Sequence, residues 1–173
     1  MWTIRPEAPG DAAAIRDVHL GAFAPGRTEA DLVDALRAGD AYMPELCLVA
    51  LDGDTVAGHI AFSRAHLDSG HPVLALAPVG VLCERQGHGA GSALVREGLQ
   101  RAAQTQLGLV VVLGTPAYYP RFGFEPAGDL GIEAPFPVPA EAWMAHRLPA
   151  YRAEVRGRVV YPPAFAEAGE PEG

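Results

Sequence analysis

Apolar residues recur with a helical spacing in some segments and with a strand spacing in others. These two patterns predict the helices and strands of the chain. Apolar residues spaced three to four apart predict helices over 10–23, 28–38 and 91–106. Alternating or continuous β-branched runs predict strands over 2–6, 46–51, 55–67 and 107–114, and a further strand that begins near His71. The turn at Asp52-Gly53-Asp54 joins two of these strands and predicts an antiparallel hairpin.

The strand that begins near His71 is interrupted by Pro78 and Gly80. Proline donates no ladder hydrogen bond and glycine offers no side chain to pack, so we expect a bulge or a splayed strand there. The helix and the strand that follow complete a strand, helix, strand unit. A proline-rich stretch then precedes a final strand over 153–162.

Composition restricts the class of protein. A chain of 173 residues with 49% hydrophobic residues fits one domain, 1–173. The net charge of −8 disfavours nucleic acid and anionic membranes as partners, although many soluble cytosolic proteins carry such a charge. Two cysteines and no zinc-ligand spacing predict no metal site. With neither a leader pattern nor a long apolar run, we expect a cytoplasmic protein.

The segment "RQGHGAGSAL", from Arg85 to Leu94, carries glycines at every second position between a strand and a helix. Free amides at a helix N-terminus bind anions, and glycines let a phosphate approach the main chain, so a phosphate ligand is predicted. The alternative is a glycine turn that only changes the chain direction. The spacing matches neither the Walker-type loop nor the dinucleotide fingerprint.

Two longer motifs carry a resemblance to a known family. "VGVLCERQGHGAGSALVREGL" resembles the acetyl-CoA motif of the GNAT superfamily of N-acetyltransferases, with Gln86, Gly89 and Gly91 at its defining positions. "VVVLGTPAYYPRFGFEPA" resembles the signature of the YhbS-like branch of that superfamily. The order of the predicted elements is also similar to the GNAT fold, so the resemblance covers nearly the whole chain.

The resemblance implies an α/β (α+β) fold with a mixed, mostly antiparallel sheet, helices on both faces and a V-shaped opening beside the motif strand. It implies acetyl-CoA as the cosubstrate. The main chain of Val79 and Val81 would meet the pantetheine and the thioester. The pyrophosphate would be held by the amides of the glycine segment, from Gln86 or Gly87 through His88, Gly89, Ala90, Gly91 and Ser92.

The resemblance also suggests a catalytic acid. Family members often protonate the departing thiolate with a tyrosine four residues before the glycine of the Gly-Phe pair, which corresponds to Tyr119. Tyr118 is then expected to pack or to form a substrate wall. A packing role for Tyr119 is the alternative.

The sequence does not identify the general base. The motif strand has no carboxylate, so His59, His66 or a chain of water molecules are the alternatives. The remaining histidines have no placement that favours them. The acidic residues of the second helix would either attract a cationic acceptor or form a solvated face; these are Glu29, Asp31 and Asp34.

The expected function is transfer of an acetyl group from acetyl-CoA to a primary amine of a small molecule or a protein. A non-catalytic acyl-CoA-binding or regulatory module is the first alternative, and a different nucleotide-binding α/β protein is the second. The acceptor is not specified by the sequence. Either a monomer or a homodimer is expected, the latter through the apolar run "RVVYPPAF".

Overall fold

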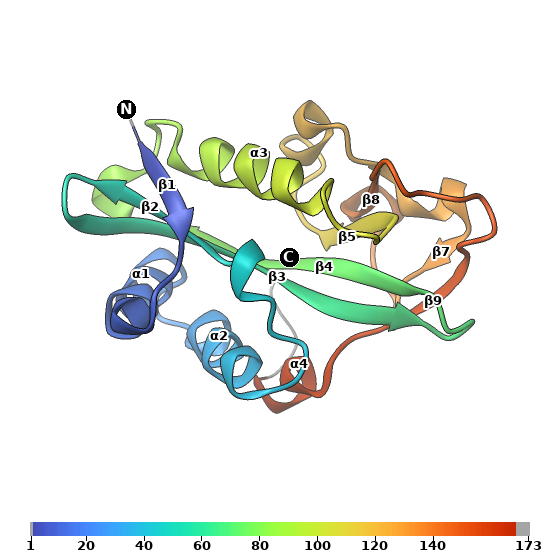
Figure 1. The fold of residues 1–173 in the computed structure, drawn as a ribbon, viewed down its shortest axis with the longest axis horizontal. Coiled ribbons are helices and arrows are strands. Elements are labelled where there is room, and N and C mark those ends of the chain that lie inside the picture. Colours follow the sequence, from blue (N-terminus) through green and yellow to red (C-terminus); the bar gives the residue numbers. More distant parts are fainter. Residues whose placement is uncertain (1, 169–173) are drawn as a thin grey trace.

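A mixed β-sheet runs through the molecule and separates helices on its two faces (Figure 1). The structure is a computed structural model that describes residues 2–168. The helices are α1 (Ala12–Ala22), α2 (Thr28–Ala38), α3 (Ala90–Ala102) and α4 (Pro163–Ala168). The strands are β1 (Thr3–Pro6), β2 (Leu48–Asp52), β3 (Thr55–Leu67), β4 (Pro72–Val81), β5 (Leu109–Leu113), β6 (Glu125–Pro126), β7 (Ile132–Glu133), β8 (Trp143–Arg147) and β9 (Gly157–Val160).

The strand order is β1-β2-β3-β4-β5-β8-β6, and every neighbouring pair in it is antiparallel except β4 and β5. β9 pairs with the end of β3 and, in parallel, with β7. The parallel pair follows from the crossover through α3, because a parallel connection needs a long return segment. The mixed, mostly antiparallel sheet expected from the sequence is therefore confirmed.

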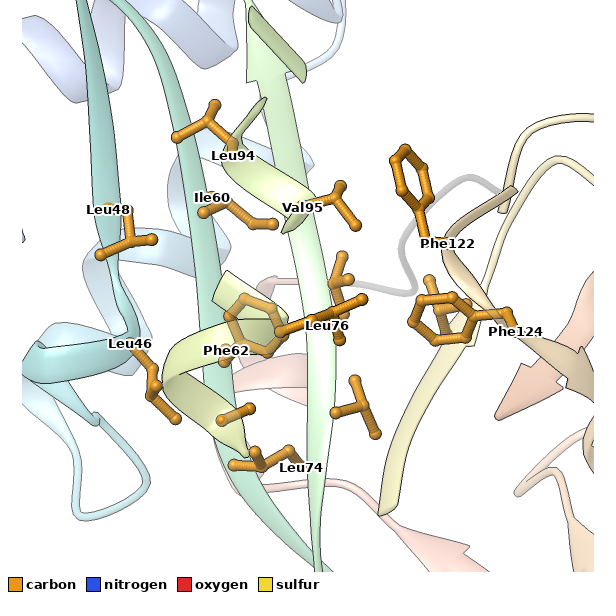
Figure 2. Packing of buried hydrophobic residues seen from close by; sticks show 14 of the residues in the cluster. Leu46, Leu48, Ile60, Phe62, Leu74, Leu76, Leu94, Val95, Phe122 and Phe124 are labelled. Carbon is orange, nitrogen blue, oxygen red and sulfur yellow. The ribbon is translucent and has the colours of Figure 1, made fainter. Parts of the chain in front are cut away.

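α3 covers one face of the sheet and buries the larger apolar cluster. Leu94 and Val95 on α3 belong to the same apolar cluster as Ile60 and Phe62 on β3, and all four side chains are fully buried (Figure 2). Gly98 brings α3 closest to the sheet, because a Cβ at this position would collide with the ring of Phe62. Phe122 and Phe124, which follow β5, close the cluster at its side (Figure 2).

α1, α2 and α4 cover the opposite face (Figure 1). Ile15 on α1 and Val33 on α2 pack against Val49 on β2, and Leu32 and Leu36 belong to a second cluster that reaches α4. No helix within residues 2–168 is both long enough and apolar enough to cross a bilayer.

The predicted helices and the hairpin are present, with two local differences. Asp11 lies at the N-cap position of α1, where an aspartate commonly caps a helix, but it makes no capping bond. Its carboxylate instead accepts hydrogen bonds from Arg5, at 2.7 Å, and from the amide of Ala8, at 2.7 Å. The strand β8 was not predicted. It follows a proline-rich stretch that hides its pattern, and its place in the sheet comes from pairing with β5.

The interruption predicted in β4 is confirmed and has two parts. Ile60 pairs with Val79 and Phe62 with Leu76, so two residues of β4 bulge opposite one residue of β3. On its other side β4 pairs with β5 only through Leu74 and Ala75. Beyond Ala75 the two parallel strands separate, which leaves an opening beside the second half of β4.

Candidate functional site

A cavity of about 590 Å³ lies where β4 ends and α3 begins. Its wall comes from four parts of the chain: the end of α1, the second half of β4, the glycine turn with the first turn of α3, and the segment after β5. The lining residues are Ala22, Phe23, Val79, Gly80, Val81, Arg85, Gln86, Gly87, Gly89, Ala90, Gly91, Ser92, Tyr118 and Arg121.

The glycine turn holds the main chain in a conformation that other residues adopt at a cost. Gly87 has φ +81° and Gly89 has φ +87°, both in the left-handed region. Gly89 is the N-cap of α3, and no side chain caps the helix. The amides of the first turn are therefore left for a ligand, and the helix dipole adds positive partial charge there.

Two side chains fix this turn. The indole Nε1 of Trp2 donates a hydrogen bond to the carbonyl of His88 at 2.9 Å. The amide Nε2 of Gln86 donates to the carbonyl of Val81 at 3.0 Å and ties the turn to the end of β4. The role of Trp2 was not apparent from the sequence, because it lies 86 residues away in the chain.

Most of the residues predicted to bind the cosubstrate are brought together at the cavity. The wall contains Val79, Val81, Gln86, Gly87, Gly89, Ala90, Gly91 and Ser92. His88 is not part of it: its carbonyl faces Trp2, and its ring Nδ1 lies 2.9 Å from the carbonyl of Gln86. The binding role of each residue, His88 included, stays a prediction.

The two tyrosines occupy different environments. Tyr118 lies on the cavity wall, with its hydroxyl 3.3 Å from Oγ of Ser92. Tyr119 is 7% exposed and its ring packs against Gly114, just past the end of β5. Burial raises the pKa of Tyr119 above its usual range, so its hydroxyl keeps its proton at neutral pH. The role of Tyr119 as the acid stays a prediction.

Two guanidinium groups border the cavity. Arg121 donates to the carbonyl of Tyr118 at 2.9 Å and lies over the ring of that residue, 4.7 Å from the ring centre. Nε of Arg85 lies 3.2 Å from the carboxylate of Asp52. Both groups bring positive charge to the glycine turn of an otherwise acidic protein.

The histidines considered as bases lie in different places. His66, near the end of β3, lines a separate cavity of about 890 Å³ between α2, β9 and α4. His59 is fully buried in the middle of β3 and lies 3.0 Å from Glu7 and 2.8 Å from His19. His19 and Glu7 were missed by the sequence reasoning, since nothing in their local pattern indicates that the fold joins them.

The acidic residues of α2 are engaged within the protein. Asp31 and Asp34 form ion pairs with Arg16 of α1 at 3.0 Å and 2.7 Å, and Glu29 is 5% exposed. These contacts join α1 to α2. In residues 2–168, moreover, no group of three or more His, Cys, Asp or Glu side chains is placed to hold a metal ion.

Comparison with known proteins gives consistent matches. The model of the Acetyltransferase (GNAT) family matches residues 13–124. YjhQ of Escherichia coli K12, an uncharacterized N-acetyltransferase, is 40% identical over 158 residues, which cover 86% of each chain. YhbS of the same strain, also an uncharacterized N-acetyltransferase, is 37% identical over 148 residues, which cover 84% of this chain and 86% of YhbS.

Two solved structures resemble the whole chain. The crystal structure of Escherichia coli YhbS in complex with CoA has a TM-score of 0.88 and 34% identity, over 98% of this chain and 94% of that one. A GNAT family acetyltransferase from Brucella melitensis in complex with acetyl-CoA has a TM-score of 0.77 and 36% identity, over 95% of this chain and 98% of that one.

Proposed function

This chain belongs to the acetyltransferase (GNAT) family, and from that premise we propose that it transfers the acetyl group of acetyl-CoA to a primary amine. Donor and acceptor are bound together, and the amine attacks the thioester directly. The observation that carries the proposal is the position of the uncapped glycine turn, which opens into the cavity at the separation of β4 from β5.

The glycine turn would bind the pyrophosphate of CoA. The amides between Gln86 and Ser92 offer a row of donors at the positive end of α3, and a Cβ at Gly87 or Gly89 would strain the turn. Arg85 and Arg121 would add charge that complements the phosphates. Main-chain donors dominate this arrangement, so it requires glycines more than particular side chains.

The opening beside β4 would bind the pantetheine arm. Past Ala75 the strand has lost its partner β5, so main-chain groups near Val79 and Val81 are available to the two amides of pantetheine. An extended ligand would lie along the strand and bring the thioester toward Gly80. The developing oxyanion would then be stabilised by a main-chain amide of β4.

Tyr119 is the proposed acid. Its ring lies against Gly114, where β5 has ended, and its hydroxyl is protonated at neutral pH because burial raises its pKa. A protonated hydroxyl beside the sulfur would donate to the thiolate as the C–S bond breaks. Tyr118 would contact the cosubstrate nearer to Ser92.

The first experiment is a calorimetric titration of the purified protein with acetyl-CoA, CoA, NAD and ATP. We expect selective binding of acetyl-CoA and CoA, because the turn fits a pyrophosphate and the opening fits a pantetheine. A panel of small amines and peptides, monitored by release of free CoA thiol, then tests transfer. Preference for NAD or ATP would contradict the proposal and indicate another nucleotide-binding protein.

A non-catalytic acyl-CoA-binding module is the second candidate. It is favoured by one observation, the absence of any carboxylate from β4, whose sequence is PVLALAPVGV. Tight binding of acetyl-CoA without thiol release for any amine of the panel would support the module. Thiol release with one amine class would reject the module and identify the acceptor class.

A further inference from the structure

A row of hydrogen-bonded side chains crosses the face of the sheet beneath the cavity. Glu7, which follows β1, lies with Oε1 3.0 Å from Nε2 of His59 on β3. Nδ1 of His59 lies 2.8 Å from Nε2 of His19 on α1. The His59 side chain has no exposure, and the Glu7 side chain has 2%. Such a row of buried ionisable groups needs a reason, because burial of polar groups costs free energy.

The hydrogen bonds of this row determine which ring nitrogen of each histidine carries a proton. Arg37 binds the other carboxylate oxygen of Glu7 at 2.7 Å and, with His59, lowers the pKa of Glu7 against the effect of burial. An ionised carboxylate only accepts, so His59 donates from Nε2 and accepts at Nδ1. His19 must then donate from Nε2. This order leaves a lone pair on Nδ1 of His19.

That lone pair has no hydrogen-bond partner among the described residues. His19 is 1% exposed, and an unpaired buried acceptor is costly, so its Nδ1 is the unexplained atom of the row. It points at Gly80, where a Cβ would lie only 2.8 Å from Nδ1. Gly80 lines the cavity, and so does Phe23, whose ring stacks on His19.

We propose that His19 is the general base that takes a proton from the acceptor amine at Gly80, with His59 and Glu7 as the residues that position it. This inference rests on the proposed acetyl transfer and deepens it. Because Gly80 has no side chain, Nδ1 of His19 lies directly beside β4 at the cavity, where the amine would reach it itself or through one water molecule. A Cβ at this position would lie 2.8 Å from Nδ1 and would force the ring or the strand to move.

Proton transfer begins at the substrate ammonium. An N–H bond of the substrate ammonium breaks, its electron pair stays on nitrogen, and the proton binds Nδ1 of His19. The freed pair attacks the acetyl carbon, the C–S bond breaks with its pair on sulfur, and Tyr119 protonates the sulfur. The nitrogen of the acetylated product still carries one extra proton, which passes to the phenolate of Tyr119. His19 then releases its proton to solvent.

The surroundings favour a neutral resting base. Burial, with His59 and Arg37 nearby, lowers the pKa of His19 well below its usual value, so the lone pair is available at neutral pH. When His19 becomes charged, the carboxylate of Glu7 at the far end of the row opposes that cost. The other groups that act on the row are Asp11, which favours a charged His59, and Tyr42, which lies beside Arg37.

The main test compares His19→Asn with His71→Asn, a control in the turn between β3 and β4 that lies outside the row. We expect His19→Asn to lower kcat at pH 7 by about 10²-fold and to lose the acid limb of the pH profile. Its affinity for CoA should change less than about twofold, and this binding also shows that the variant folds. Unchanged kcat and pH profile would overturn the base role.

Two further variants separate chemistry from structure. Gly80→Ala keeps His19 in the sequence but forces its ring away from β4, so kcat should fall while CoA still binds. Glu7→Gln should move the acid limb of the pH profile rather than abolish it, because it acts through His59. If Gly80→Ala turned over at the original rate, the position of Nδ1 beside Gly80 would have no part in catalysis.

The protonated nitrogen of each histidine ring can be measured without an acceptor amine. Nitrogen-15 NMR of the histidine rings in the CoA-bound protein should show neutral His19 with its proton on Nε2; a proton on Nδ1 would overturn the proposal. Failure of the unaltered protein to acetylate any amine at any pH would overturn the proposed transfer and the base role together. Transfer at an unchanged rate in His19→Asn would overturn the base role alone.

Discussion

The glycines of the turn look alike in the sequence but contribute differently to the site. Gly87 and Gly89 are in the left-handed region, where open space surrounds the position of a Cβ. Gly91 has an ordinary helical φ, and a Cβ there would lie 3.3 Å from the hydroxyl of Tyr118. Glycine is therefore required at the first two positions by the left-handed backbone. At the third position it is favoured because a side chain would crowd Tyr118.

Gly89→Ala should weaken CoA binding through strain alone. A residue with a Cβ pays about 1–2 kcal/mol in the left-handed region, so the turn would relax away from its binding shape. We expect a loss of about tenfold in CoA affinity by calorimetry. Gly128→Ala is the matched control, since its Cβ would also meet open space but its φ lies outside the left-handed region. Equal affinities for the two variants would argue against the turn as the phosphate site.

Tyr119→Phe should lower kcat by about 10²-fold and leave CoA affinity nearly unchanged, because it removes only the donated proton. Tyr118→Phe should instead weaken CoA binding, since it removes the hydroxyl near Ser92. Steady-state kinetics of both variants with one acceptor from the panel make the comparison. A greater loss of kcat in Tyr118→Phe would move the acid role to that residue.

At the scale of elements, the contact between α3 and β3 shows how a helix position is fixed by one small residue. Gly98 costs helix propensity, yet it lets α3 approach until the ring of Phe62 fills the space of a Cβ. Phe62 is fully buried and cannot move aside easily. The start of α3, which carries the glycine turn, depends on this placement.

Gly98→Ala should destabilise the protein. Overpacking against Phe62 costs about 1–3 kcal/mol, which exceeds or matches the gain of about 1 kcal/mol in helix propensity. Urea unfolding should show a lower midpoint. When Gly98→Ala is added to the Phe62→Leu variant, it should lower the stability less than in the unaltered protein, or raise it. An equal loss in both backgrounds would mean that the ring is not the obstacle.

Elements with a strong local pattern were predictable, and long-range assembly was not. The hairpin turn at Asp52 to Asp54, the periodic helices and the interruption at Pro78 follow from local chemistry. β8 lacked such a signal, because it follows a proline-rich stretch and its partner β5 lies 30 to 38 residues earlier. In the candidate site, the glycine turn could be predicted from spacing, whereas the row of Glu7, His59 and His19 forms only through tertiary contacts.

At the scale of the whole molecule, the face of the sheet under α1 and α2 holds buried charge in addition to apolar packing. Arg37 of α2 binds the buried carboxylate of Glu7 at 2.7 Å, whereas at the exposed surface Arg16 of α1 binds two aspartates of α2. The helices on this face are therefore connected to the sheet by ionisable groups. Stability should respond to pH through them.

The free energy of unfolding should decrease as pH falls from 6.5 to about 5. Burial lowers the pKa of His19, His59 and His146 below the usual 6.5, so in this window the unfolded chain binds protons that the folded protein does not. Below about 4.5 the loss should continue, since Glu7 has a lowered pKa in the folded state. Urea titrations at several pH values measure this, with a shallower slope expected for His19→Asn. A flat profile would contradict the neutral, buried state of these rings.

The early end of the pairing between β4 and β5 has a further consequence. It gives β4 a free edge inside the sheet. Beyond Ala75, β4 keeps β3 on one side, and no strand within residues 2–168 pairs with its other side. Edge strands on the outside of a sheet recruit strands of other proteins and promote aggregation. Here α3 lies above the edge and α1 below it, so a bulky polypeptide is kept away (Figure 1). A thin, extended chain of amides such as pantetheine is the kind of partner that this edge still admits.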